Sequence, residues 1–456
     1  MPTQTQSLHT MPPELNTKAR PAATGRPPPA SLTPIDTALD MLLANLAPIT
    51  AQETVPLASA SGRILATAIV AASNVPAQAV SAMDGYAIHT ADQAAANSNA
   101  TDSDVADSDA ASANATSAAT GTVLPVTERI SAGQVGEPLP RGQAARIFTG
   151  APLPKGADAV VMQEDCKLEN KHIRLLTQVN PDANLRQAGE DITAGAEVLP
   201  AGHRLRPQDV GILASLGLTE VSVRRPLRVA LLTTGDELAE PGQPLAPGQI
   251  YNANRHTLTA LLAQLPVTVI DCGTVGDDLE ATRAALFAAK QQTDCIICTG
   301  GVSVGEEDHV KTALQQEGSL KLWKLAIKPG KPLAYGKLET THFFGLPGNP
   351  VSAFVTFCLI VRPCLLTMLG CNQPFPKRIP LPAGFTRTTS GQRQEYLRAS
   401  VRDNPQGHPE LQPHPKQNSG IATSLSNSDG LAIIPPHTAV AAGDMLEFIP
   451  YSEMSG

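Results

Sequence analysis

The residues with the clearest chemical potential lie in the stretch Asp294–Lys331. A short apolar run, Cys295–Cys298, leads into the glycine-rich segment Thr299–Gly305, whose backbone N–H groups can approach a ligand closely. An acidic patch, Glu306–Asp308, opens a helical segment, and a second apolar strand ends at Lys328–Lys331. By itself the loop is read more simply as a glycine turn. Together, the loop, the carboxylate and the lysines favour a phosphate or oxyanion site at the ends of neighbouring strands.

Carboxylates recur just after successive expected strands, at Glu237, Asp277 and Asp308. We expect them to converge on one edge of a sheet, where they could hold Mg²⁺ against phosphates through oxygen ligands. Lys324 and Lys328 are four residues apart in an expected strand, so they should share a face. The two lysines would supply the positive charge that an oxyanion needs.

Other motifs place polar side chains beside turn-forming residues. SAMDGYA at Ser81–Ala87 reads on pattern alone as an Asp-Gly turn before a strand, and RIFTGA at 146–151 and RQAGED at 186–191 fit ordinary turn chemistry. FFGLPGNP at 343–350 predicts a rigid turn before a helix over 351–369, whose free N–H groups could face an anion. No Ser–His–Asp or Cys–His set is evident, so a covalent enzyme intermediate is not indicated.

The elements that must position these residues change character along the chain. Apolar residues at helical spacing predict a helix from Ile35, with Thr33 as its cap, and residues 123–226 are β-rich. From Leu227 strands and helices alternate, which predicts a parallel sheet with right-handed crossovers. A small β domain is expected over Pro380–Ile449.

Length and composition limit the number of domains and the kinds of ligand that can be expected. The chain of 456 residues is too long for one core, so several domains are expected. Its net charge of −8 argues against nonspecific nucleic-acid binding, and the lysines that would bind an anion must be concentrated locally. Residues 1–32 and the Ala/Ser/Asp-rich insertion 91–120 are expected to be disordered and flexible, respectively, because they have too little apolar surface to fold.

Cysteine usage and hydropathy indicate the compartment. Seven cysteines, several inside apolar runs, suit a reducing cytosol. Cys295 and Cys298 form a CxxC sequence, but residues three apart in a strand face opposite sides, so buried core is favoured over a metal site. The N-terminus has no signal-peptide core, and the apolar stretch Phe354–Leu369 is judged too short to span a bilayer. We expect a soluble cytoplasmic protein that does not associate with membranes.

As a set, the motifs resemble the molybdopterin molybdenumtransferase (MoeA) family, which includes the E domains of gephyrin and its plant counterpart. The resemblance is carried, in order from residue 33 onward, by SAMDGYA (81–87), FTGAPLPKGADAVVMQE (148–164), GED (189–191), TGDEL (234–238), TGGVSVGEED (299–308), KLAIKPGKP (324–332) and GLPGNPVSAF (345–354). One departure is Gln78-Ala79-Val80, where the family often has Phe-Asp-Asn.

The resemblance implies an activity. Such an enzyme takes adenylylated molybdopterin and molybdate, inserts molybdenum at the dithiolene and releases AMP, with Mg²⁺ as the usual cation. The family forms an elongated homodimer whose active site lies where the α/β domain of one subunit meets its neighbour, and other molybdenum cofactor biosynthesis proteins are expected partners. Two alternatives stay open: an adenylyltransferase, whose fold resembles residues 227–375 alone, and a non-catalytic scaffold of the gephyrin type.

The resemblance also assigns residues. The functional positions implied by motif are Asp84, Thr149, Glu237, Asp277, Asp308, Lys324 and Lys328, with Glu237, Asp277 and Asp308 as metal ligands. Substrate binding is expected of Gly300, Gly301, Ser303, Gly305, Asp191, Pro347, Asn349, Pro350, Arg398 and Ser419. The implied fold class is multidomain α/β plus β: a connector (33–75 and 192–226), a β-rich inserted domain (76–191), a doubly wound molybdopterin-binding domain (227–375) and a C-terminal small β-barrel (376–456).

Overall fold

The computed structural model describes residues 32–93, 121–301 and 309–455. Three expected site residues, Ser303, Gly305 and Asp308, lie outside the described residues. The same holds for nearly all of the N-terminal tail and the insertion 91–120.

The largest body is an α/β sheet with the strand order β16-β13-β17-β21-β20-β18. The first four strands are parallel, and β20 runs antiparallel to both of its neighbours, β21 and β18, so the expectation of a wholly parallel sheet was wrong. The physical reason is that β18, β20 and β21 follow one another without the helix that a parallel crossover needs. The strands are β13 (Leu227–Thr234), β16 (Val267–Val275), β17 (Cys295–Thr299), β18 (Ser319–Lys324), β20 (Pro332–Leu338) and β21 (Thr341–Leu346).

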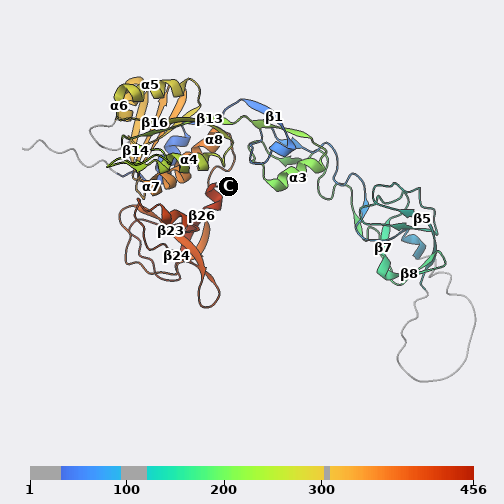
Figure 1. The fold of residues 1–456 in the computed structure, drawn as a ribbon. Helices are drawn as coiled ribbons and strands as arrows, with labels where there is room; N and C mark the ends of the chain where they lie inside the picture. The colour runs from blue at the N-terminus through green and yellow to red at the C-terminus, as the bar shows by residue number, and fades with distance from the viewer. Residues whose placement is uncertain (1–31, 94–120, 302–308, 456) are drawn as a thin grey trace, which may run out of the picture.

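Helices cover both faces of this sheet (Figure 1). One face packs against α5 (Leu279–Lys290) and α6 (His309–Glu317), and the other against α4 (Ala253–Leu262) and the segment from α7 (Pro350–Thr356) to α8 (Arg362–Met368). Cys295 lies in one packing cluster and Cys298 in the other, which confirms that the two cysteines face opposite sides.

The helical segment Pro350–Met368 is continuous, with a π-helical stretch at Phe357–Val361. Its 19 residues are long and apolar enough to cross a membrane, contrary to the expectation from sequence, but 89% of this apolar stretch is buried inside the fold. The segment therefore packs as a core helix of the α/β body, in contact with α4 and α1.

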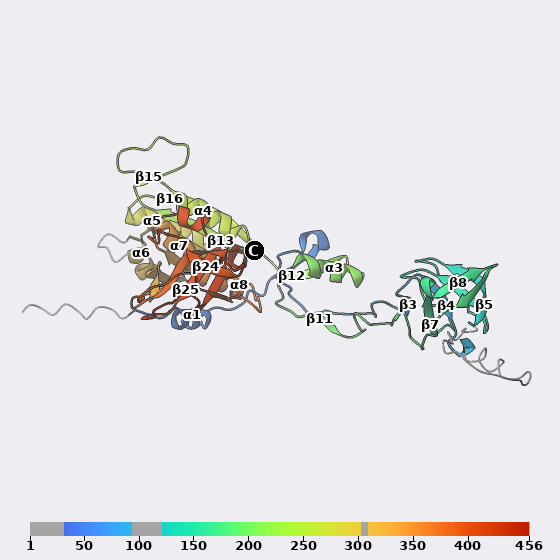
Figure 2. The same cartoon turned by 90° about the horizontal axis from the view of Figure 1, so that it is seen from below.

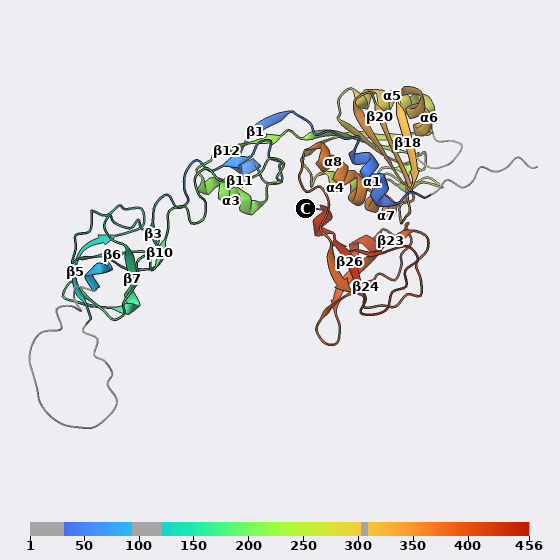
Figure 3. The same ribbon diagram turned by 180° about the vertical axis from the view of Figure 1, so that it is seen from behind.

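Helix α1 (Ile35–Leu43) buries Ile35, Ala38, Leu39 and Leu42, the face predicted from its periodicity. Thr33 does not cap it; Pro34 occupies the N-cap, and the Thr33 backbone instead bonds to Lys324 and Ala326. Although its residues fall in the range expected for the connector, α1 packs into the core of the α/β body beside α8 (Figure 3).

The C-terminal part forms a six-stranded sheet in the order β19-β23-β25-β26-β22, with β24 paired to β23. These pairings define a sheet, and its closure into a barrel stays a prediction. Strand β19 joins this sheet although its chain neighbours β18 and β20 belong to the α/β sheet. The bounds are β19 (Ile327–Lys328), β22 (Ile379–Pro382), β23 (Gln394–Asp403), β24 (Pro409–Pro413), β25 (Gly430–Ile434), β26 (Met445–Pro450), α9 (Thr423–Ser426) and α10 (Ser452–Ser455).

The remaining residues extend away from the α/β body in a line (Figures 1 and 2). A middle body contains α3 (Pro207–Ser215) and paired strands from both passes of the chain, β1 (Gln52–Pro56) with β12 (Glu220–Arg224) and β2 (Ile69–Val70) with β11 (Glu197–Leu199). The pair β3 (Val80–Ser81) and β10 (Leu185–Arg186) leads on to an outer sheet in the order β7-β4-β6-β5-β9-β8. Its strands are β4 (Gly85–Ile88), β5 (Val123–Ile130), β6 (Ala144–Ile147), β7 (Ala159–Met162), β8 (Cys166–Glu169) and β9 (His172–Leu175).

Candidate functional site

The carboxyl ends of β13 and β17 lie side by side at the point where the chain switches direction in the sheet. From β13 the chain crosses to β16 on one side and then to β17 on the other. Gly300 and Gly301 follow β17 with positive φ angles of 93° and 60°. A Cβ atom at Gly300 would lie 2.4 Å from the carbonyl oxygen of Thr234, so only glycine fits there. Open α/β sheets bind ligands at such switch points.

A cleft of about 530 Å³ opens at this edge, between the α/β sheet and the C-terminal sheet. Its described lining contains three cationic side chains, Lys328, Lys331 and Arg393, and no carboxylate, histidine or cysteine. In a chain with a net charge of −8 this is a local concentration of positive charge. The lining comprises Gly300, Gly301, Lys328, Pro329, Gly330, Lys331, Pro332, Pro347, Gly348, Asn349, Ser352, Arg393, Gln417, Asn418 and Ser419.

Asn254, which sequence reasoning missed, ties two walls of the cleft together. Its side-chain amide donates to Thr299 Oγ1 at 3.1 Å and to the Gly348 carbonyl oxygen at 2.7 Å. Thr299 in turn donates to the Pro347 carbonyl oxygen at 3.1 Å. The start of α4 therefore holds the end of β17 against the Pro347–Asn349 turn. No motif pointed to Asn254, because its role depends on a contact with a distant part of the chain.

Arg398 does not line the cleft, although substrate binding was expected of it. It is 1% exposed and supports the wall from behind, donating from Nε to Ser424 Oγ at 3.1 Å and from Nη2 to the Asn418 carbonyl oxygen at 3.4 Å. Burial lowers the pKa of this guanidinium. The arginine that faces the cleft is Arg393, which directly precedes β23 and was not among the expected site residues.

Lys324 and Lys328 do not share a strand, which corrects the expectation that they present one face. Lys324 ends β18 of the α/β sheet, whereas Lys328 lies in β19 of the C-terminal sheet. Only Lys328 lines the cleft. Its Nζ atom lies 3.5 Å from Oε2 of Glu395, the residue paired with it across β19 and β23. Local spacing could not show this, because the chain leaves one sheet and enters another between the two lysines.

Glu237 and Asp277 follow the neighbouring parallel strands β13 and β16, as expected, and both are exposed. Asp236, the residue before Glu237, joins the two strand ends, because its Oδ1 accepts a hydrogen bond from the Asp277 N–H at 3.0 Å. Neither Glu237 nor Asp277 lines the cleft. Within the part of the chain that the structure describes, no three acidic, histidine or cysteine side chains gather closely enough to hold a metal by themselves.

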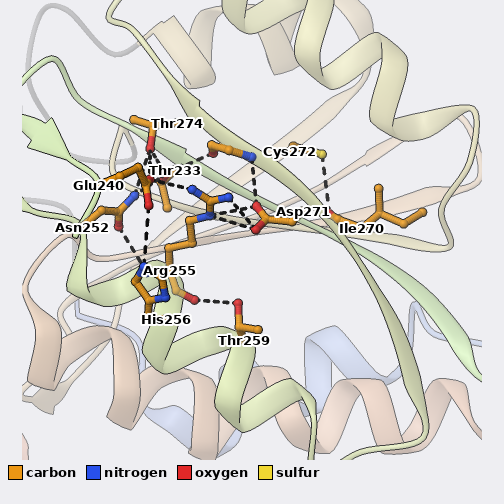
Figure 4. Close-up of polar contacts among 11 residues, drawn as sticks. Thr233, Glu240, Asn252, Arg255, His256, Thr259, Ile270, Asp271, Cys272 and Thr274 are labelled. Carbon is orange, nitrogen blue, oxygen red and sulfur yellow. Dashed lines mark hydrogen bonds and ion pairs between the residues drawn. The ribbon is translucent and has the colours of Figure 1, made fainter. Parts of the chain in front are cut away.

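A polar network fixes the arm that follows Glu237 (Figure 4). This arm contains β14 (Leu238–Ala239) and β15 (Ile250–Tyr251) and projects from the α/β body (Figure 2). Arg255 binds Asp271 at 2.6 Å and Glu240 at 2.6 Å, so it joins the arm to β16. Partial burial alone would raise the pKa of Asp271, but the hydrogen bonds from Arg255 and the Gly273 N–H, together with the Arg255 charge, outweigh burial and lower the pKa. The network thereby positions the backbone that carries Glu237.

Asn252 forms the second half of this network. Its amide donates to Thr233 Oγ1 at 2.8 Å and to Thr274 Oγ1 at 3.0 Å, while its Oδ1 accepts the Arg255 N–H at the start of α4. Both hydroxyls lie near the carboxyl ends of β13 and β16 (Figure 4). Asn252 is therefore an N-cap that also bridges the two strands.

Asp84, Thr149 and Asp191 lie in the extended part of the molecule, away from the cleft (Figure 1). Asp84 and Thr149 are joined directly: Asp84 Oδ1 accepts bonds from the Thr149 N–H and Oγ1, both at 2.8 Å. These bonds lower the pKa of Asp84, so the carboxylate form is favoured. Beside Thr149, the Phe148 ring is flanked by the guanidinium groups of Arg129 at 4.5 Å and Arg146 at 4.7 Å.

One cleft thus collects six of the expected residues: Gly300, Gly301, Lys328, Pro347, Asn349 and Ser419. Pro350 begins α7 directly beside it, and the Val351 N–H donates to the Ser419 carbonyl oxygen at 3.1 Å. The single chain does not bring Asp84, Thr149 or Asp191 to this cleft.

A helix-covered α/β sheet with a cationic cleft at its carboxyl edge, walled by a C-terminal β sheet, defines a protein that handles an anionic ligand. Three family descriptions match the chain in order: "MoeA N-terminal region (domain I and II)" over residues 33–217, "Probable molybdopterin binding domain" over 230–367, and "MoeA C-terminal region (domain IV)" over 380–451.

Curated proteins and solved structures agree with these matches. The molybdopterin molybdenumtransferase of Haemophilus influenzae is 37% identical over 92% of this chain and 99% of its own length. Molybdopterin molybdenumtransferase 2 of Mycobacterium tuberculosis is 34% identical over 86% of this chain and 94% of its own length. The crystal structure of the molybdopterin biosynthesis MoeA protein from Pyrococcus horikoshii matches with a TM-score of 0.75 and 30% identity, covering 92% of this chain and 100% of that one.

The chain belongs to the molybdopterin molybdenumtransferase (MoeA) family. It is a transferase of molybdenum cofactor biosynthesis, and the substrates of its family are molybdopterin and molybdate. Because the relatives match over nearly their whole length, the resemblance is not confined to the α/β body that an adenylyltransferase would share.

Proposed function

We propose that the cleft between the α/β sheet and the C-terminal sheet binds molybdate and is the place where molybdenum is transferred to molybdopterin. The observation that carries this proposal is the charge of the described lining: Lys328, Lys331 and Arg393 without any carboxylate. Molybdate is a dianion, and a partly enclosed group of cations stabilises it more strongly than the same charges in open water. The amide groups of Asn349 and Gln417 and the Ser419 hydroxyl add hydrogen-bonding partners.

The molybdopterin substrate is proposed to be the adenylylated form, with AMP as the released product. The glycine edge supports this assignment, because Gly300 and Gly301 allow a phosphate group to approach the carboxyl end of β17 closely. In this arrangement the lysines hold the oxyanion. The Pro347–Asn349 turn, which Asn254 fixes in place, orients the substrate. With no cysteine or histidine in the described lining, the proposed transfer runs directly between the two substrates.

Mg²⁺ is proposed to bind at the corner formed by Glu237 and Asp277, with Asp308, which lies outside the described residues, as a further ligand. Asp236, Glu237 and Asp277 are exposed oxygen donors after neighbouring strands, which is the donor chemistry that Mg²⁺ prefers. Mg²⁺ commonly uses one or two carboxylates together with phosphate oxygens, so a three-carboxylate cluster is not required. The ion would neutralise phosphate charge beside these carboxylates.

The active protein is proposed to be a homodimer in which Asp84 and Thr149 of one chain meet the cleft of the other. Within one chain Asp84 directly precedes β4 and Thr149 follows β6 of the outer sheet, which lies at the far end of an elongated molecule (Figure 1). Thr149 is exposed and its hydrogen-bonding partner Asp84 is half-buried, and neither residue is part of the described lining of the cleft of its own chain. The seven cysteines, none of which forms a disulfide in the described residues, are consistent with a proposed cytoplasmic location, where other cofactor-biosynthesis proteins would supply and accept the substrates.

The decisive experiment supplies purified protein with adenylylated molybdopterin, Mg²⁺ and molybdate and follows AMP release. AMP release that requires molybdate and Mg²⁺ supports the proposal. A parallel calorimetric titration with molybdate alone tests the anion site. Protein that binds molybdate equally well after Lys328, Lys331 and Arg393 are all replaced by Gln would overturn the assignment of the cleft.

A further inference from the structure

A buried carboxylate lies directly behind the cationic wall of the cleft. Glu395, in β23, is 2% exposed and faces a second pocket of about 380 Å³. Lys328 and Arg393 line both this pocket and the cleft, so one wall separates the two spaces. The second pocket is completed by Arg387 and by residues 391–392 and Leu32.

Glu395 is held firmly by one cation and loosely by another. Arg387 binds it through both guanidinium nitrogens, at 3.0 Å to Oε1 and 2.9 Å to Oε2, the bidentate arrangement that gives strong carboxylate pairing. Lys328 lies 3.5 Å from Oε2, and its side chain remains 45% exposed. The carboxylate is therefore anchored by Arg387, while the Lys328 ammonium is free to interact with the cleft as well.

We propose that Glu395 is a positioning residue that sets how tightly the cleft holds a divalent oxyanion, acting through Lys328. This inference rests on the proposed molybdate site. The buried negative charge of Glu395 attracts the Lys328 ammonium. At the low local dielectric it also repels a dianion that enters the cleft beside Lys328. The physical benefit is that a substrate dianion held too tightly in its ground state raises the barrier to its transfer.

Two substitutions in this cluster should change anion affinity in opposite directions. Glu395→Gln keeps the shape but removes the charge, so Lys328 is released to the cleft and molybdate binding should tighten about threefold or more. Arg387→Lys keeps the positive charge but loses the bidentate clamp, so Glu395 should pair more closely with Lys328 and molybdate binding should weaken. A merely structural role for the cluster predicts no gain of affinity from either change.

The experiment is calorimetric titration of the intact protein with sodium molybdate at two ionic strengths, with Glu447→Gln as the matched control. Glu447 belongs to the same sheet and pairs with Arg378 at 2.8 Å, but it lines neither pocket. The Glu395→Gln variant should show a lower Kd with a steeper dependence on salt, a lower KM for molybdate and a lower kcat. The control should match the unmodified protein.

The outcomes distinguish a failure of the proposed molybdate site from a failure of the role given to Glu395. If the unmodified protein does not bind molybdate, the proposed function of the cleft fails and this inference fails with it. If it binds molybdate and Glu395→Gln leaves the Kd unchanged or raises it, the inference alone is overturned. Should Glu395→Gln not fold, as judged by Trp323 fluorescence, the Arg387→Lys variant decides, because an unchanged or lower Kd there contradicts the proposal.

Discussion

The side-chain amide of Asn254 donates a hydrogen bond of 2.7 Å to the carbonyl oxygen of Gly348, and so joins the first helix after β13 to the turn after β21. The same nitrogen reaches Thr299 at the end of β17. Two walls of the cleft are therefore held in register by one residue that does not itself line the cleft.

Asn254→Asp should lower molybdate-dependent AMP release at least tenfold, while the free energy of unfolding changes by only about 1–2 kcal/mol. A carboxylate cannot donate to the Gly348 carbonyl and repels it, so the Pro347–Asn349 turn loses its anchor. The control is Asn45→Asp, at an exposed asparagine whose side-chain amide donates to the nearby Met41 carbonyl oxygen. Full activity of a folded Asn254→Asp protein would contradict the role given to this residue.

Lys324 and Lys328 should behave differently although they are neighbours in the sequence. Lys328→Gln removes a cation from the cleft wall and should weaken molybdate binding about tenfold, with a change in stability below ~1 kcal/mol because the side chain is partly exposed. Lys324→Gln should change the Kd by less than about twofold, since Lys324 is not part of the lining. Titration calorimetry on both variants, with the exposed Lys321→Gln as reference, makes the comparison. An equal loss of molybdate affinity in the Lys324→Gln and Lys328→Gln variants would instead support the expectation that both lysines face the same site.

A composite active site predicts complementation between inactive chains. At limiting molybdate, Asp84→Asn and Lys328→Gln should each lower turnover by about tenfold or more, but coexpression should restore about a quarter of the wild-type rate, because half of randomly paired dimers contain one intact site of two. AMP release by the coexpressed mixture measures this, after purification through one tag shared by both variants, so that homodimers and heterodimers are recovered together. A mixture no more active than its separate variants would indicate that each chain completes its own site.

His342 should make the α/β body sensitive to mild acid. Burial, with a contribution from Lys337, lowers the pKa of His342 from 6.5 to about 4, and Tyr335 Oη lies 3.0 Å from its Nδ1. Between these two pKa values the unfolded chain takes up a proton that the folded chain does not, so stability is complete above pH 6.5 and falls as the pH drops towards 4. The expected loss is about 1–3 kcal/mol.

Urea unfolding followed through Trp323, the single tryptophan of the chain, would report this effect, since its ring centroid lies 6.1 Å from that of Tyr335. His342→Gln should be less stable at pH 7 but should flatten the decline between pH 6.5 and 5. His408→Gln, at an exposed histidine, should leave the pH profile as it is in the unmodified protein. An unchanged slope in His342→Gln would assign the acid sensitivity to other groups.

Many strands and helices of the α/β body could be predicted from the sequence, because the patterns that indicate them lie within short stretches of the chain. The sequence predicts a strand over Arg228–Thr234 and a helix over Leu279–Gln291, and β13 and α5 lie within one residue of these bounds. Cys295 and Cys298 face opposite sides, as strand alternation requires. The close backbone approach at Gly300 could also be predicted locally, because glycine adopts positive φ angles whatever its tertiary surroundings. The family motifs further picked out Lys328, Asn349 and Ser419, which do line one cleft.

Tertiary structure decided the rest, because it depends on contacts between segments that are far apart in the chain. A strand as short as Ile327–Lys328 joins whichever sheet offers it hydrogen bonds, and β23 of the C-terminal sheet does so; this separates Lys328 from Lys324 and brings it to Glu395. Packing, not residue type, buries Arg398 and leaves Arg393 in the cleft. The long antiparallel connections carry Asp84 to the far end of the molecule, where no local pattern could have placed it.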